Sequence, residues 1–140
     1  MTDAELLEKK LAVIETCVAD LRRLAAPALI ATDLREERFA EHTLQIAIQA
    51  ALDAASHIVS DARLGEPRSN RELFTLLERG GWIGADLTRS LSAMAGFRNV
   101  LVHGYGDVDL GVVEDVVENR LDDLLAFVET VRRRGIGGVT

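Results

Sequence analysis

The segment from residue 34 to residue 62 constrains the fold of this chain more than any other part of the sequence. Its apolar residues recur at helical spacing without a break, which predicts one long helix. They occupy two sides of that helix, Leu44, Ile48, Ala51, Ala55, Ile58 and Ala62 on one and Ile46, Ala50 and Ala54 on another. A helix with so much apolar surface must be packed on more than one flank.

Two further helices are predicted from capping boxes, in which a Ser or Thr and a later Glu satisfy free backbone N–H groups. Thr2 and Glu5 open a helix of roughly 3–25, and Pro27 stops the chain just beyond it. Ser69 and Glu72 open a short helix that ends at the glycine pair before Trp82. The apolar face of the first helix consists of Leu7, Leu11, Ile14, Val18, Leu21 and Ala25.

The last two helices are predicted at about 86–101 and from about Asp109 onward. The final helix carries Val113, Val117, Leu121, Leu124, Val128 and Val131 on one face. No alternating pattern typical of a strand remains. The sequence therefore predicts an all-α fold, an antiparallel bundle of about five helices in a single domain of residues 1–140, with a short basic flexible tail from about residue 132.

Composition excludes several classes of protein. No apolar run approaches the ~20 residues that a membrane span needs, and the charged N-terminus is unlike a signal peptide, so we expect a cytoplasmic protein. The formal net charge of −7 argues against broad electrostatic capture of nucleic acid, so any RNA contact must be local. The single cysteine, Cys17, has apolar neighbours and is expected to be a buried hydrophobe.

The sequence RNVLVHGY, residues 98–105, does not fit this plain helical pattern. Arg98 extends the apolar stripe of the fourth helix, so its guanidinium needs an anionic partner. That partner could be a carboxylate of the same chain, in an internal salt bridge, or a bound phosphate. His103 lies five residues later, about 140° around an unbroken helix. Either the helix ends before His103, or the partners of Arg98 and His103 come from different chains.

Arg98, Asn99, His103 and Tyr105 together resemble the Arg-x4-His motif of the HEPN superfamily, in the variant with a following tyrosine that marks the HepT toxins. The resemblance extends to the stretch EERFAEHTLQIAIQAALDAASHIVSD, which is similar to the long second helix of that family. It includes ELFTLLERGGWI, which is similar to the third helix and its turn. The resemblance covers most of the chain.

The resemblance implies a metal-independent endoribonuclease, the toxin of a toxin–antitoxin pair, that works as a homodimer with no cofactor. Two copies of the motif would face one another across a cleft and cleave RNA at an internal phosphodiester. His103 can exchange protons near neutral pH, and Arg98 can grip two phosphate oxygens, with Asn99 beside it. One histidine cannot conveniently act as acid and base at once, and a two-fold axis supplies the second.

Tyr105 is the residue that cleavage explains least. Its ring could pack under the site and orient the imidazole. The resemblance implies a second role, because the partner of HepT toxins is a small nucleotidyltransferase antitoxin, MntA, that transfers AMP onto this tyrosine. The added bulk and negative charge beside Arg98 would then exclude the phosphate of RNA.

The residues alone also allow other functions for this protein. A helical dimer could hold a nucleotide through Arg98 and His103 without cleaving, or serve as an adaptor. His42 and His57 lie too far apart along one helix to share a metal ion, so no metal site is predicted. A polar stripe on the long helix, comprising Gln45, Gln49, Asp53, Ser56, His57 and Ser60, could line the cleft or face solvent.

Overall fold

The computed structural model describes the backbone of residues 2–103 and 108–136, and the side chains of residues 4–102 and 108–134. The helices are α1 (Thr2–Leu24), α2 (Leu34–Asp61), α3 (Asn70–Arg79), α4 (Ala85–His103), α5 (Leu110–Asp115) and α6 (Leu121–Val131). A 3-10 turn at Pro27–Leu29 and π-helical turns at Val116–Arg120 and Arg132–Ile136 connect or extend them. Within the described ranges there is no strand, and the predicted all-α helical bundle is confirmed.

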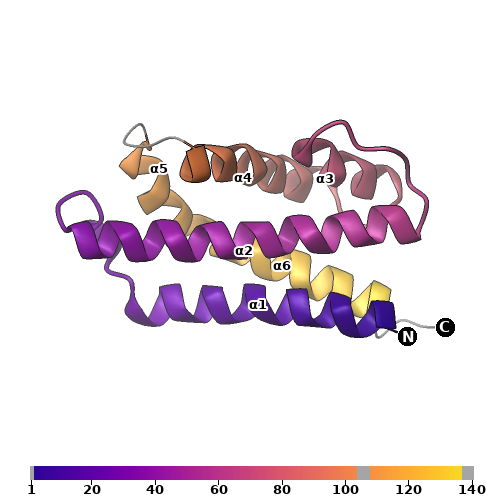
Figure 1. Ribbon diagram of the computed structural model, residues 1–140, viewed down its shortest axis with the longest axis horizontal. Helices are drawn as coiled ribbons and strands as arrows, with labels where there is room; N and C mark the ends of the chain where they lie inside the picture. Colours follow the sequence, from indigo (N-terminus) through magenta and orange to yellow (C-terminus); the bar gives the residue numbers. More distant parts are fainter. Residues whose placement is uncertain (1, 104–107, 137–140) are drawn as a thin grey trace.

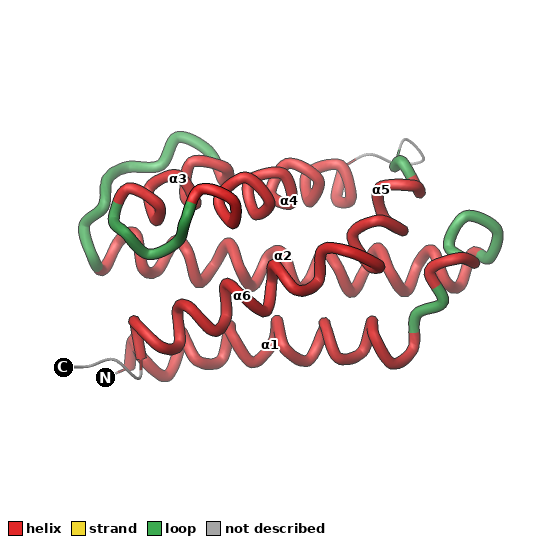
Figure 2. Tube along the Cα trace, turned by 180° about the vertical axis from the view of Figure 1, so that it is seen from behind, coloured by secondary structure: helices red, strands yellow, loops and turns green. Residues whose placement is uncertain are grey.

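Helix α2 occupies the middle of the bundle. Helices α1 and α2 run side by side along the long axis, while α3 and α4 lie on the opposite side of α2 (Figure 1). Helix α6 runs obliquely across the back and contacts both α1 and α4 (Figure 2). The prediction that the long helix packs on more than one flank is therefore confirmed.

The ends of the helices follow from their capping residues. Asp33 accepts a hydrogen bond from the Arg35 backbone N–H at 2.9 Å and starts α2. Ser69 starts α3 as predicted, accepting from the Glu72 N–H at 3.2 Å. The carboxylate of Glu72 returns to the N–H of Arg68, at 2.9 Å, one residue before the position that a capping box requires.

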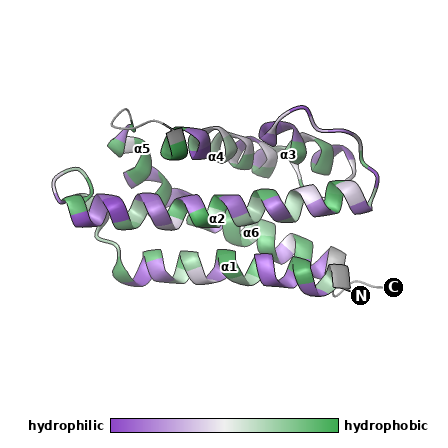
Figure 3. Ribbon diagram, viewed as in Figure 1, coloured by the Kyte–Doolittle hydropathy of each residue, from purple (hydrophilic) through white to green (hydrophobic). Residues whose placement is uncertain are grey.

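The predicted apolar faces form the core. All six predicted positions on the last helix are buried, and so are the five on α1; the sixth predicted for the first helix, Ala25, follows α1 and is half-buried. Figure 3 shows the corresponding alternation of hydrophobic and hydrophilic residues along α1 and α2. Two predicted core residues of α2 are exposed: Ala62, which caps the end of α2, and Ile46, whose side of the helix is only partly covered. Of the helices in the described ranges, none is long and apolar enough to span a membrane.

The last predicted helix is interrupted by a π-helical turn. The turn at Val116–Arg120 separates α5 from α6 and places two successive residues, Val116 and Val117, in the core. A π turn holds one more residue than an α turn, so the interruption shifts which residues face inward. The spacing of apolar residues in the sequence did not reveal it.

The predicted tail begins with a second π-helical turn, Arg132–Ile136, that contacts two other parts of the fold. Arg132 binds Glu8 and Glu15 of α1. Arg134 donates to the backbone oxygens of Gly81 and Gly80 and stacks over Trp82, with Cζ 4.6 Å from the ring centroid. These contacts join the end of the chain to α1 and to the connection between α3 and α4.

Candidate functional site

Arg98 lies on α4 immediately beyond a buried apolar stripe. Leu91 and Met94 are buried on that stripe, and Arg98 follows them half-buried, as the sequence predicts. Its Nε atom is buried and finds no hydrogen-bond partner in the described part of the chain. Its Nη1 donates to Oδ1 of Asn99 at 3.5 Å, which is a long contact.

The internal salt bridge considered from the sequence is not formed with any described residue, since no described carboxylate lies within 4.0 Å of Arg98. A half-buried guanidinium with an unsatisfied Nε is costly unless an anion binds there. The partial burial of Arg98 and the lack of a described carboxylate beside it favour an anion-binding role for this residue.

His103 is the last residue of α4, so the helix does not end before it. At about 100° per residue, position 103 lies about 140° around the axis from position 98. The two motif positions of one chain therefore fall on different sides of the same helix. The side chain of His103 and the whole of Tyr105 lie outside the described residues, and the roles predicted for them remain predictions.

Position 103 shares a face of α4 with Gly96, Asn99 and Val100, at helical spacings of three and four. Asn99 and Val100 are exposed on that face, and 39% of Val100 is accessible. Asn99 and Val100 therefore form an exposed surface near the end of α4 that RNA or another polypeptide can approach.

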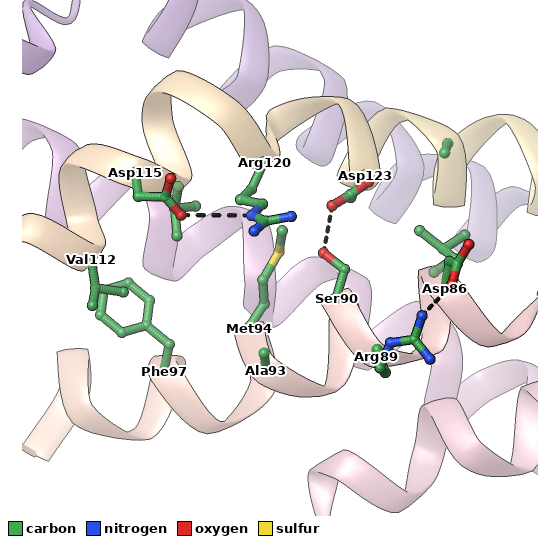
Figure 4. Close-up of a pocket in the computed structure, with 13 residues that line it drawn as sticks. Asp86, Arg89, Ser90, Ala93, Met94, Phe97, Val112, Asp115, Arg120 and Asp123 are labelled. Carbon is green, nitrogen blue, oxygen red and sulfur yellow. Dashed lines mark hydrogen bonds and ion pairs between the residues drawn. The ribbon is translucent and has the colours of Figure 1, made fainter.

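A groove of about 740 Å³ lies elsewhere on α4, between that helix and the chain from α5 to α6 (Figure 4). Phe97 and Met94 line its floor with Val112 opposite. Neither Arg98 nor Asn99 lines it. The groove and the motif are thus separate features of the same helix.

The charges in this groove do not favour a phosphate ligand. Its lining contains three carboxylates and two guanidinium groups, and both guanidinium groups are already paired, Arg89 with Asp86 and Arg120 with Asp115. The third carboxylate, Asp123, accepts a hydrogen bond from the Ser90 hydroxyl. With a net negative charge and its cations paired, the groove is a poor site for RNA.

The polar stripe of α2 is partly occupied by contacts within the chain. Asp53 forms an ion pair with Lys10 of α1 at 3.0 Å and accepts a hydrogen bond from Gln49 at 2.8 Å.

Cys17 is buried, as predicted. Burial, with a smaller contribution from Asp20, raises the pKa of its thiol and makes it a poor nucleophile.

The family model described as Ribonuclease HepT-like matches residues 14–131, most of the chain. The chain belongs to the HepT-like family. Membership confirms the resemblance drawn from the motif and from the two flanking stretches. The structure places Arg98 and Asn99 in the last two turns of α4, half-buried and exposed respectively.

Relatives of known name support the same family. The mRNA nuclease HepT of Shewanella oneidensis is 30% identical over 91% of this chain and 97% of its own length. The tRNA nuclease HepT of Aphanizomenon flos-aquae is 29% identical over 94% of this chain and 92% of its own. The solved structure of the tri-AMPylated HEPN toxin of S. oneidensis, in complex with MNT antitoxin, superposes with a TM-score of 0.84 at 30% identity, covering 91% of this chain and 96% of that one.

Proposed function

We propose that this HepT-like protein is a metal-independent endoribonuclease, the toxin of a toxin–antitoxin pair, whose active site forms where two copies of the chain meet. The names of the two HepT relatives, one an mRNA nuclease and the other a tRNA nuclease, support RNA as the substrate. The charge balance of the chain supports local contacts made by a few residues, because a net charge of −7 provides no broad attraction for RNA.

The observation that carries the proposal is the continuation of α4 through His103. Because positions 98 and 103 lie about 140° apart around one helix, we infer that Arg98 of one copy and His103 of the other act on the same phosphate. A two-fold axis beside the exposed end of α4 would bring Arg98 and His103 of both copies to a common cleft. The open surface at Asn99 and Val100 leaves room for that approach.

Cleavage then needs only the groups that the motif supplies. The imidazole of His103 in one copy takes the proton from a ribose 2′-hydroxyl, and the 2′-oxygen attacks the adjacent phosphorus. The bond from phosphorus to the 5′-oxygen breaks, and the imidazolium of the second His103 donates a proton to that oxygen. The products are a 2′,3′-cyclic phosphate and a free 5′-hydroxyl.

Arg98 stabilises the charge that develops on the phosphorane. Its guanidinium can donate two parallel hydrogen bonds to phosphate oxygens. The amide of Asn99 is exposed beside it and can contact the same phosphate or the adjoining ribose. Arg98 therefore binds the scissile phosphate, and Asn99 helps to position it.

The partner that silences the enzyme is, in this proposal, a nucleotidyltransferase related to MntA. The AMPylated state of the S. oneidensis toxin in its complex with MNT antitoxin supports this. The Tyr105 hydroxyl attacks the α-phosphorus of ATP, the α–β anhydride bond breaks, and pyrophosphate leaves. Negative charge close to Arg98 would then compete with RNA for the guanidinium.

The proposal is tested by incubating the purified wild-type protein with RNA in the presence of a chelator. Cleavage that persists and leaves 2′,3′-cyclic phosphate ends is the expected result. Cleavage that stops in chelator and returns with a divalent cation would contradict the metal-independent mechanism. RNA or nucleotide binding without cleavage would indicate a non-catalytic HEPN binding module or adaptor instead.

A further inference from the structure

The side chain of Arg71 lies directly against the backbone of α4 at Gly96. A Cβ atom built on Gly96 would lie 2.9 Å from Cζ and 3.0 Å from Nε of Arg71, and would collide with Nη2. Separations under 3.0 Å do not occur for real Cβ atoms, so the guanidinium occupies the space that a side chain at position 96 would need. Glycine at this position is therefore what allows Arg71 of α3 to rest on α4.

The place where Arg71 rests is on the same side of α4 as His103. Seven residues separate positions 96 and 103, which places them about 20° apart around the axis and about 10 Å apart along it. Asn99 and Val100 lie between them on that side, and both are exposed. A cation contributed by α3 thus extends the surface that carries the catalytic motif.

Arg71 is exposed and makes no hydrogen bond or ion pair with a side chain in the described ranges. Its neighbour Arg68 does pair within α3, donating to Glu72 at 3.4 Å. The positive charge of Arg71 is therefore not neutralised locally by the described residues. Its guanidinium lies against the backbone of α4 at Gly96 and remains accessible from solvent.

We propose that Arg71 binds a phosphate of the RNA substrate next to the scissile one and fixes the register of the strand across the cleft. This inference rests on the ribonuclease function proposed above. In a chain with a net charge of −7, a few placed guanidinium groups must provide the attraction for RNA that overall charge does not. Because position 96 lies about 160° around α4 from position 98, Arg98 of one copy would hold the reacting phosphate, and Arg71 of the other copy would hold a neighbour of it. Arg71 is a positioning residue and takes no part in proton transfer.

Gly96 provides a second way to test the same contact. In Gly96→Ala the new methyl group must displace the guanidinium of Arg71, while alanine favours the helix by up to ~1 kcal/mol relative to glycine. The variant is expected to be at least as stable as wild type and yet to bind RNA less well. Loss of binding without loss of stability distinguishes a substrate contact from a structural one.

The experiment measures binding of a fluorescent single-stranded RNA of mixed sequence in a His103→Ala background, over a series of salt concentrations. Arg71→Ala and Gly96→Ala are each expected to weaken binding roughly tenfold and to reduce the slope of log K against log salt by about 0.7 for each phosphate that the protein no longer neutralises. Arg71→Lys should recover part of the affinity. Arg79→Ala removes an exposed arginine from the far end of the same helix and serves as the control, with unchanged binding.

Cleavage by the single variants in an otherwise wild-type chain separates this inference from the proposed function. If wild-type protein cleaves RNA, and Arg71→Ala cleaves and binds RNA as wild type does, the inference about Arg71 is wrong and the proposed ribonuclease function is retained. If wild-type protein binds RNA without cleaving it, and Arg71→Ala lowers affinity and salt slope while Arg79→Ala does not, the ribonuclease proposal fails and the phosphate contact stands. Equal weakening by Arg71→Ala and Arg79→Ala would also contradict the inference.

Discussion

The guanidinium of Arg132 binds the carboxylate of Glu15 through two hydrogen bonds, each 2.9 Å long. The same guanidinium also donates to both carboxylate oxygens of Glu8, at 2.5 and 3.1 Å. The Arg132 side chain thus holds two carboxylates of α1 that lie about two turns apart. The hydrogen bonds from Arg132 lower the pKa of Glu15 more than burial raises it. The bonds to Glu15 and Glu8 together raise the pKa of Arg132.

We predict that Arg132→Gln lowers the free energy of unfolding by about 1 kcal/mol at pH 7, since the bonds are charged and bidentate but partly exposed. The pKa of Glu15 is lower in the folded state than its ordinary value of 4.5. The part of this stabilisation that comes from Glu15 is therefore complete above pH 4.5 and is lost as the pH falls through the folded-state pKa of Glu15. Urea unfolding at pH 7 and at a series of acidic pH values measures it.

Arg133→Gln is the matched control for this measurement. Arg133 is the next residue, and its only described ion pair is a 3.7 Å contact with Glu129 in which both side chains are about 70% exposed. We expect a much smaller loss of stability for this variant. Equal losses for the two variants, or a loss for Arg132→Gln that persists unchanged in acid, would mean that the α1 contacts do not hold the C-terminal turn.

Substitutions at Arg98 should affect cleavage much more than folding. Arg98→Ala is expected to abolish RNA cleavage. Arg98→Lys is expected to retain only a small fraction of the activity, because lysine keeps the charge but cannot form the bidentate hydrogen bonds to phosphate. Circular dichroism and thermal unfolding should show a folded helical protein in both cases. Wild-type cleavage by Arg98→Lys would mean that a point charge suffices and that guanidinium geometry does not matter.

Tyr105→Phe should separate catalysis from regulation. The phenol has an intrinsic pKa near 10, so at neutral pH it is a poor base beside an available imidazole. We expect the variant to retain substantial ribonuclease activity and to escape inactivation by the nucleotidyltransferase partner with ATP. Mass spectrometry should find AMP on the wild-type peptide that contains Tyr105 and none on the variant peptide. A variant as inactive as His103→Ala would instead assign Tyr105 to the chemistry.

The helices could be predicted from the sequence because their signals are local. Ser69 caps α3 through a bond three residues away, and the apolar residues of α1 repeat at the spacing of a single helix. The π turn at Val116–Arg120 was missed because its valines fit an ordinary helical pattern equally well. Ile46 was misassigned for a related reason, since the spacing of residues does not show how far a neighbouring helix extends.

Arg98, Asn99 and His103 were proposed as site residues because a motif places them close together in the sequence, and their roles remain predictions. The approach of Arg71 to Gly96 joins two helices through tertiary packing, and no pattern within either helix indicates it. The same holds for the anchoring of Arg134 on Trp82, which brings residues 52 positions apart into contact.

The central claim is that two copies of His103, one from each chain, act together in one cleft. It is tested most directly with a mixed dimer of one wild-type chain and one His103→Ala chain, purified through two different affinity tags and assayed on RNA in chelator. The account predicts that cleavage falls by about 100-fold or more relative to a wild-type dimer carrying the same tags, because either the proton acceptor or the proton donor is missing. A mixed dimer that retains about half of the wild-type activity would show that each chain carries an independent site, and would contradict the account.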